Sequence, residues 1–165
     1  LICTFLLGNN SKVTDAQNTY NQAIADLGQN KADSIELYTN AYSRLSGLKL
    51  SGDDKQLYNK LSVLASVSGK YDAYKSFSDS GYVTMAADSL VCAAGRCAVN
   101  ADNAKEYGCE LQLEQLKNII SDTLSSQYGL SYDDAIALYN IDDRDDYTLA
   151  LTQKLNELGI KEETK

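Results

Sequence analysis

The sequence predicts an all-α protein built from antiparallel helical hairpins, about eight helices in total, stacked as an array or folded as a compact bundle. Three observations predict this class. The 165 residues include no proline, which helix interiors exclude. Apolar residues recur at spacings of three and four along most of the chain, as one face of a helix requires. No long stretch alternates apolar and polar residues as a half-buried strand would.

The first half of the chain predicts four helices. The first two cover residues 11–27 and 31–48 and form a hairpin, and Gly28 is expected to end the first. A third helix is expected to start within residues 51–54 and to end at Ser68 and Gly69. A shorter helix then covers residues 70–78.

Residues 81–128 predict the hairpin around which the fold is organised. The apolar stripe of its first helix consists mainly of small residues: Val83, Ala86, Leu90, Ala93 and Cys97. The stripe of its second helix is bulkier: Cys109, Leu113, Leu116, Ile120 and Leu124. A slim helix can pack closely against a bulky one, so the two stripes are expected to face each other. The polar residues 100–103 are expected to form the turn.

The C-terminal part predicts two more helices. Gly129 is expected to stop the hairpin and Ser131 to cap the next helix. That helix buries one apolar face: Ala135, Ile136, Leu138 and Tyr139. The last helix carries a stripe made of Tyr147, Leu151, Leu155 and Leu158. Gly159 is expected to close it.

The N-terminal run LICTFLL is apolar but far too short to cross a bilayer. We interpret residues 1–10 as the end of a hydrophobic anchor or leader, and residues 11–165 as a single helical domain. This predicts an extracytoplasmic, cell-surface or membrane-anchored bacterial protein. A short buried element at the start of the domain is the alternative, and with it a cytoplasmic location.

Composition excludes several function classes. The chain has no histidine, so it lacks Ser-His-Asp and Cys-His catalytic pairs and His-containing zinc sites. The net charge of −8 arises entirely after residue 82 and disfavours binding to nucleic acid. No glycine-rich segment matches a nucleotide signature. We therefore expect a non-enzymatic protein without a cofactor.

Two segments resemble tetratricopeptide-type repeats. In residues 57–77, LYNKLSVLASVSGKYDAYKSF, five positions match the motif: Tyr58, Leu61, Ala65, Gly69 and Tyr71. Residues 132–139, YDDAIALY, resemble the second helix of the motif. The first copy departs from the motif at Ala73 and Phe77, which lie out of register. Such a resemblance implies a scaffold that binds a protein or peptide partner.

Three cysteines belong to the central hairpin. Cys97 and Cys109 lie on the inward stripes, where either a disulfide between them or two reduced core thiols fits the pattern. Cys92 offers a second pairing with Cys109. A metal site is disfavoured, because Cys92 and Cys97 are five residues apart, unlike the close cysteine pairs of zinc sites.

Four aspartates gather before the last helix: Asp142, Asp143, Asp145 and Asp146. Carboxylates are calcium ligands, so this group is a candidate cation site. It does not fit the EF-hand loop, because Arg144 interrupts the spacing. We favour another interpretation, a helix N-terminus stabilised by acidic residues together with a solvated loop. A structural or sensory domain that binds a cation or small ligand through this acidic half is therefore the alternative function.

Tyrosine occurs twelve times and supplies the candidate binding surface. The candidate residues are Tyr38, Tyr42, Tyr58, Tyr71 and Tyr74. They lie on apolar faces and so are expected in the core, with hydroxyls at its rim. If several line one concave surface, they would form a peptide-binding groove.

Overall fold

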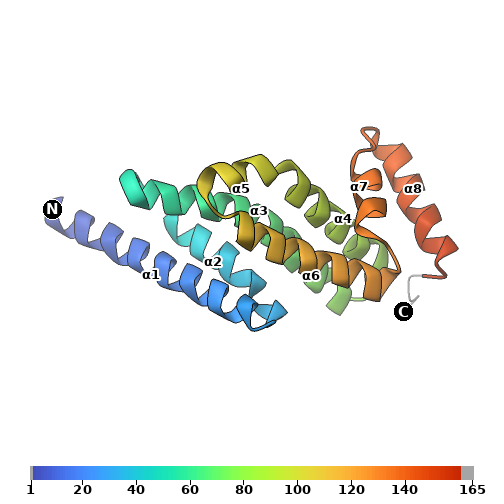
Figure 1. The fold of residues 1–165 in the computed structure, drawn as a ribbon, viewed down its shortest axis with the longest axis horizontal. Coiled ribbons are helices and arrows are strands. Elements are labelled where there is room, and N and C mark those ends of the chain that lie inside the picture. Colours follow the sequence, from blue (N-terminus) through green and yellow to red (C-terminus); the bar gives the residue numbers. More distant parts are fainter. Residues whose placement is uncertain (1, 161–165) are drawn as a thin grey trace.

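The computed structural model describes the backbone of residues 2–160 and the side chains of residues 9–160. Over this range the protein is all-helical, as predicted, with eight α-helices and no strand. They are α1 (Ile2–Gly28), α2 (Glu36–Leu45), α3 (Gly52–Asp79), α4 (Val83–Val99), α5 (Ala101–Tyr107), α6 (Glu110–Tyr128), α7 (Tyr132–Tyr139) and α8 (Arg144–Glu157), with a short 3-10 helix, η1 (Ala32–Ile35), before α2. Figure 1 shows an elongated assembly with α1 and α8 at opposite ends.

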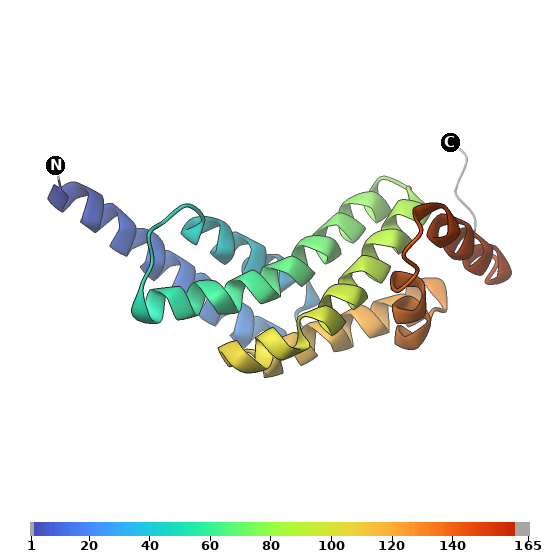
Figure 2. The same ribbon diagram turned by 90° about the horizontal axis from the view of Figure 1, so that it is seen from above.

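Helix α3 joins the two parts of the fold. It packs against α2 on one side and against α4, α5 and α6 on the other, while α1 packs mainly on α2 and η1. In Figure 2, α3 crosses the molecule between the α1–α2 pair and the group formed by α4 and α6. One hydrophobic core extends from Ala16 in α1 to Leu155 in α8. The helices therefore form one continuously packed unit over the described residues.

The predicted break at Ser68 and Gly69 is wrong, because α3 continues through both residues to Asp79. Gly69 keeps helical geometry, and apolar residues on both sides of it, such as Val67 and Tyr71, are buried. A glycine inside a helix costs about 1 kcal/mol relative to alanine, less than the burial of such neighbours contributes. The segment that resembles a tetratricopeptide hairpin in residues 57–77 is thus a single helix.

The central hairpin is confirmed, but its turn is longer than predicted. Four of the five residues in the first stripe are buried, and all five in the second are buried. The expected turn at residues 100–103 instead starts α5, and the chain reverses at Gly108 and Cys109. Gly108 adopts a left-handed conformation with φ of 70°, which ends α5 and allows the reversal.

Two small residues of α4 outside the predicted stripe, Ala94 and Gly95, let α7 approach the backbone of α4. The Tyr139 ring lies directly against Gly95, and a Cβ atom at this glycine would overlap the ring. The Tyr132 hydroxyl donates a hydrogen bond to the Ala94 carbonyl oxygen over 3.1 Å. The contact between α4 and α7 therefore depends on a residue without a side chain.

The predicted caps of α6 and α7 are confirmed. Gly129 ends α6 with φ of 63°, and Ser131 caps α7. The Ser131 hydroxyl accepts from the Asp134 amide over 3.0 Å, and the Asp134 carboxylate accepts from the Ser131 amide over 3.2 Å. This reciprocal capping box satisfies two amides at the helix start.

The N-terminal helix starts earlier than predicted. Its backbone is helical from Ile2, through the polar residues expected to precede it, and it ends at Gly28 as predicted. The anchor or leader interpretation of residues 1–10 rests mostly on side chains outside the described residues and stays a prediction. None of the described helices has the length and apolar character that a bilayer span requires.

Candidate functional site

A hollow of the surface lies between α1 and α6. It has a volume of about 490 Å³, and we call it the α1–α6 groove. One wall is the end of α1 and the following loop, and the other is the outer side of α6. The groove is lined by Leu27, Gly28, Asn30, Ala32, Tyr71, Gln115, Asn118, Ile119, Asp122, Thr123 and Ser126.

The pattern of α6 explains why this wall is polar. The apolar stripe of α6 faces the core, which turns the remaining sides of the helix outward. Groove residues recur on one of these sides from Gln115 to Ser126, which is eleven residue steps or about three turns. At 1.5 Å per residue, the wall is about 16 Å long.

The groove offers mainly uncharged hydrogen-bonding groups. Thr123 Oγ1 lies 3.4 Å from the Tyr71 hydroxyl. The Gln115 side-chain oxygen is buried without a hydrogen-bond partner among the described residues. Asp122 is exposed and forms no ion pair with any residue that the structure describes. The groove therefore presents the exposed Asp122 carboxylate as a free acceptor, and none of its lining residues is a lysine or an arginine.

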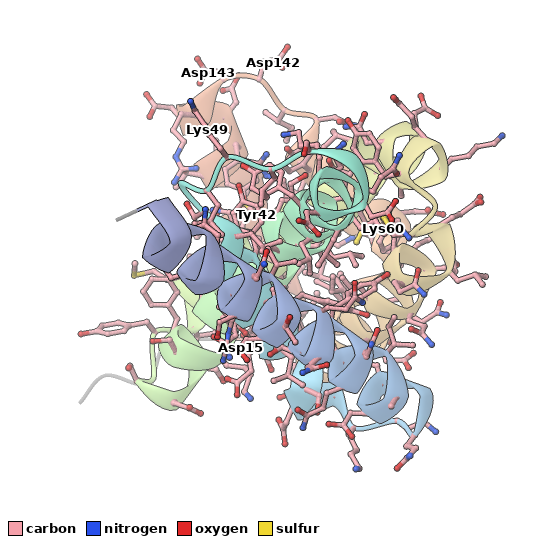
Figure 3. The ribbon with its side chains drawn as sticks, turned by 90° about the vertical axis from the view of Figure 1, so that its left-hand side faces the viewer. Asp15, Tyr42, Lys49, Lys60, Asp142 and Asp143 are labelled. Carbon is pink, nitrogen blue, oxygen red and sulfur yellow. The ribbon has the colours of Figure 1, made fainter. Side chains whose placement is uncertain are left out.

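The predicted tyrosine surface is not formed as one surface. Tyr38 is 0% exposed and cannot contact a partner. Tyr42 and Tyr58 stack with ring centroids 5.2 Å apart, and their hydroxyls are 3.0 Å apart. Figure 3 shows Tyr42 from the end of the molecule at which α1 begins, lying within the helical assembly.

Two of the five predicted tyrosines lie farther along α3. Tyr71 and Tyr74 pack against each other and are largely buried, 7% and 8% exposed. Of the five, only Tyr71 lines the α1–α6 groove. Sequence reasoning thus found one residue of this groove and missed its polar wall. One sequence pattern could have revealed this polar wall: polar residues recur on α6 away from its apolar stripe, at Gln115, Asn118, Asp122 and Ser126.

The predicted cation group has another role in the structure. Asp143 caps α8, and its carboxylate accepts hydrogen bonds from the amides of Asp145 and Asp146 over 2.9 Å and 3.0 Å. Figure 3 shows Asp142 and Asp143 on the loop before α8, at the edge of the molecule. Among the described residues, no group of three acidic, cysteine or histidine side chains converges as a metal site requires. The four aspartates therefore lie at the N-terminus of α8, in agreement with the second interpretation of this group: Asp142, Asp143, Asp145 and Asp146.

Of the two alternatives for Cys97 and Cys109, the structure has the reduced core thiols and not the disulfide, since Cys92, Cys97 and Cys109 are all free. The two inward thiols have different neighbours. Cys97 lines a hollow between α4, α6 and α7, whereas the Cys109 thiol faces the Lys60 carbonyl of α3 over 4.0 Å. Helix α5 lies between the two cysteines in the chain, and the two thiols therefore contact different helices.

A polar cluster between α2 and α3 is the only arrangement of the described chain that combines a buried serine with a carboxylate. The Thr39 hydroxyl lies 2.7 Å from the Ser68 hydroxyl and donates to the Asp72 carboxylate over 3.1 Å. Burial raises the pKa of Asp72. Ser68 is 0% exposed, so no substrate can reach it. The cluster satisfies polar groups between two packed helices and offers no site for catalysis.

Burial of thiols and phenols makes stability sensitive to alkali. Burial raises the pKa of Cys97 from 9.0 to about 12 and that of Cys109 to about 11. It likewise raises the pKa values of Tyr20 and Tyr128 from 10.0 to about 12. These groups ionise more readily in the unfolded chain. Their contribution to stability is therefore complete below about pH 9 and is lost progressively between about pH 9 and pH 12.

We therefore expect the free energy of unfolding to fall above about pH 9, by up to about 1.4 kcal/mol per pH unit for each such group. Urea unfolding followed by circular dichroism, at neutral pH and in steps above pH 9, measures this slope. An unfolding free energy that stays constant across the alkaline range would contradict the burial of these groups.

Comparison with known protein families, characterised proteins and solved structures finds no match to this chain. What the α1–α6 groove binds is therefore inferred from its own side chains.

Proposed function

We propose that this protein is a non-enzymatic binding domain whose α1–α6 groove takes up a peptide segment of a protein partner. The observation that supports this is the groove itself, about 490 Å³ in volume, with Tyr71 and a wall of three turns of α6. Binding sites combine a concave surface with a few well-placed polar groups. The proposal rests on the groove and not on the tetratricopeptide resemblance, because residues 57–77 lie within the single helix α3. The proposal includes the extracytoplasmic, membrane-anchored location predicted from the N-terminal run.

Filling the groove tests this function. Asn118 is an exposed groove residue of α6, so Asn118→Trp adds bulk to the groove with little effect on folding. Ser125→Trp is the matched control, because Ser125 is exposed on the same helix but does not line the groove. Heptapeptides displayed on phage are selected against the wild-type protein, and the enriched peptides are synthesised and their affinities measured.

We expect the enriched peptides to bind Asn118→Trp at least about tenfold more weakly, a loss of about 1.4 kcal/mol. Binding to Ser125→Trp should be unchanged, and both variants should match the wild type in thermal unfolding. If no peptide is enriched, or if both tryptophan variants bind enriched peptides as well as the wild type does, the groove is not a peptide site.

A further inference from the structure

The charge of the groove restricts what can occupy it. Asp122 is the only ionisable carboxylate among the lining residues, and no lysine or arginine lines the groove to neutralise it. It lies in the acidic second half of the chain. A bound acidic group would face this carboxylate without compensation, whereas a cation would gain an ion pair. Complementary charge of this kind favours one class of partner and disfavours the other.

The polar wall further restricts the backbone conformation of the occupant. A bound helix satisfies its own backbone groups and needs an apolar stripe to receive its apolar face. The apolar lining comes mainly from α1 and the following loop, whereas the α6 wall has one apolar residue, Ile119, and so offers no continuous apolar stripe. The other residues of this wall are polar: Gln115, Asn118, Asp122, Thr123 and Ser126. An extended segment instead presents free amides and carbonyls along its length. The Asn118 side-chain amide can bind both kinds of group, and the Thr123 and Ser126 hydroxyls, which donate to carbonyls of α6, can accept from the amides.

Dimensions agree with an extended occupant. The wall is about 16 Å long, and an extended chain advances about 3.3 Å per residue, so about five residues fit. The buried Gln115 oxygen lacks a donor among the described residues. Because the terminal torsion of glutamine is broad, this amide can turn to meet a backbone amide of the bound segment.

We propose that the occupant of the α1–α6 groove is an extended peptide segment of about five residues that places a lysine or arginine against Asp122. This inference rests on the proposed function and adds the chemistry of the partner. The ion pair lies at the exposed rim, so it contributes selectivity and salt dependence more than affinity.

The selected heptapeptides test this inference directly. We expect lysine and arginine to be enriched among peptides selected by the wild-type protein, and this enrichment to disappear when selection is repeated on Asp122→Asn. Glu106→Gln is the matched control, because Glu106 is an exposed carboxylate of α5 outside the groove. Selection on this variant should keep the enrichment.

An individual peptide gives the size of the effect. Replacing the lysine or arginine of an enriched peptide with glutamine should weaken binding by about two- to fivefold at low salt, the range of an exposed ion pair. The same replacement should have no effect on binding to Asp122→Asn. Binding of the basic peptide should also weaken as salt is added.

The outcomes separate this inference from the proposed function. Enriched peptides that lose binding to Asn118→Trp but contain no excess of basic residues would overturn the inference and leave the peptide groove intact. Basic enrichment that persists on Asp122→Asn would also overturn it. A failure to enrich any peptide would instead remove the proposed function on which it rests.

Discussion

Gly95→Ala is expected to lower the free energy of unfolding by about 1–3 kcal/mol, the usual cost of an added methyl group in a packed interior. The added Cβ atom would overlap the Tyr139 ring, so either the ring or α7 must move. Alanine favours a helix over glycine by about 1 kcal/mol, which makes a loss of stability the opposite of what helix propensity predicts. Urea unfolding followed by circular dichroism measures the change.

Two further variants assign this loss to the contact with α7. Gly69 also lies inside a helix, α3, but nothing lies within 4 Å of the position of its missing Cβ atom. Gly69→Ala should therefore stabilise the protein by about 0.5–1 kcal/mol. In a Tyr139→Ala background, Gly95→Ala should no longer destabilise, because the overlapping ring is gone. Equal effects of the two glycine substitutions would contradict the close approach of α7 to α4.

Leu116→Ala should destabilise the protein by about 2–5 kcal/mol, the range for a buried leucine replaced by alanine. Leu116 is 0% exposed and lies on the apolar stripe of α6 that faces the core. Its truncation removes buried apolar contacts and leaves a cavity that the rigid neighbouring helices fill only in part. Equilibrium unfolding in urea measures the loss.

The same helix supplies the control for this variant. Leu111 is 77% exposed, so Leu111→Ala removes little buried area and should change stability by less than about 0.5 kcal/mol. Comparable losses from Leu111→Ala and Leu116→Ala would mean that the predicted stripe of α6 does not face the core.

The periodicity of apolar residues determined the fold class, because burying a stripe with a spacing of three to four residues requires a helix whatever the neighbours are. The central hairpin was predictable for the same reason. Local chemistry determined the caps at Gly129 and Ser131, since a left-handed glycine and a side-chain acceptor act within a few residues. These features follow from interactions close together in the sequence.

Where a local stop or turn signal competes with packing, the tertiary structure decided whether the helix ends there. Ser68 and Gly69 carry a stop signal, yet burial against α2 and α4 keeps α3 continuous through them. Residues 100–103 look like a turn, but the chain reverses only at Gly108.

The groove was the least predictable feature. Its walls come from α1 and α6, nearly ninety residues apart in the sequence, and only their packing around α3 brings them together. Tyrosine composition predicted a binding surface but could not show that Tyr38 is buried and that Tyr71 alone reaches the groove. The sequence by itself therefore determined which side of each helix is buried. Only the tertiary structure decided which outward sides meet, because that depends on contacts between segments that no local pattern specifies.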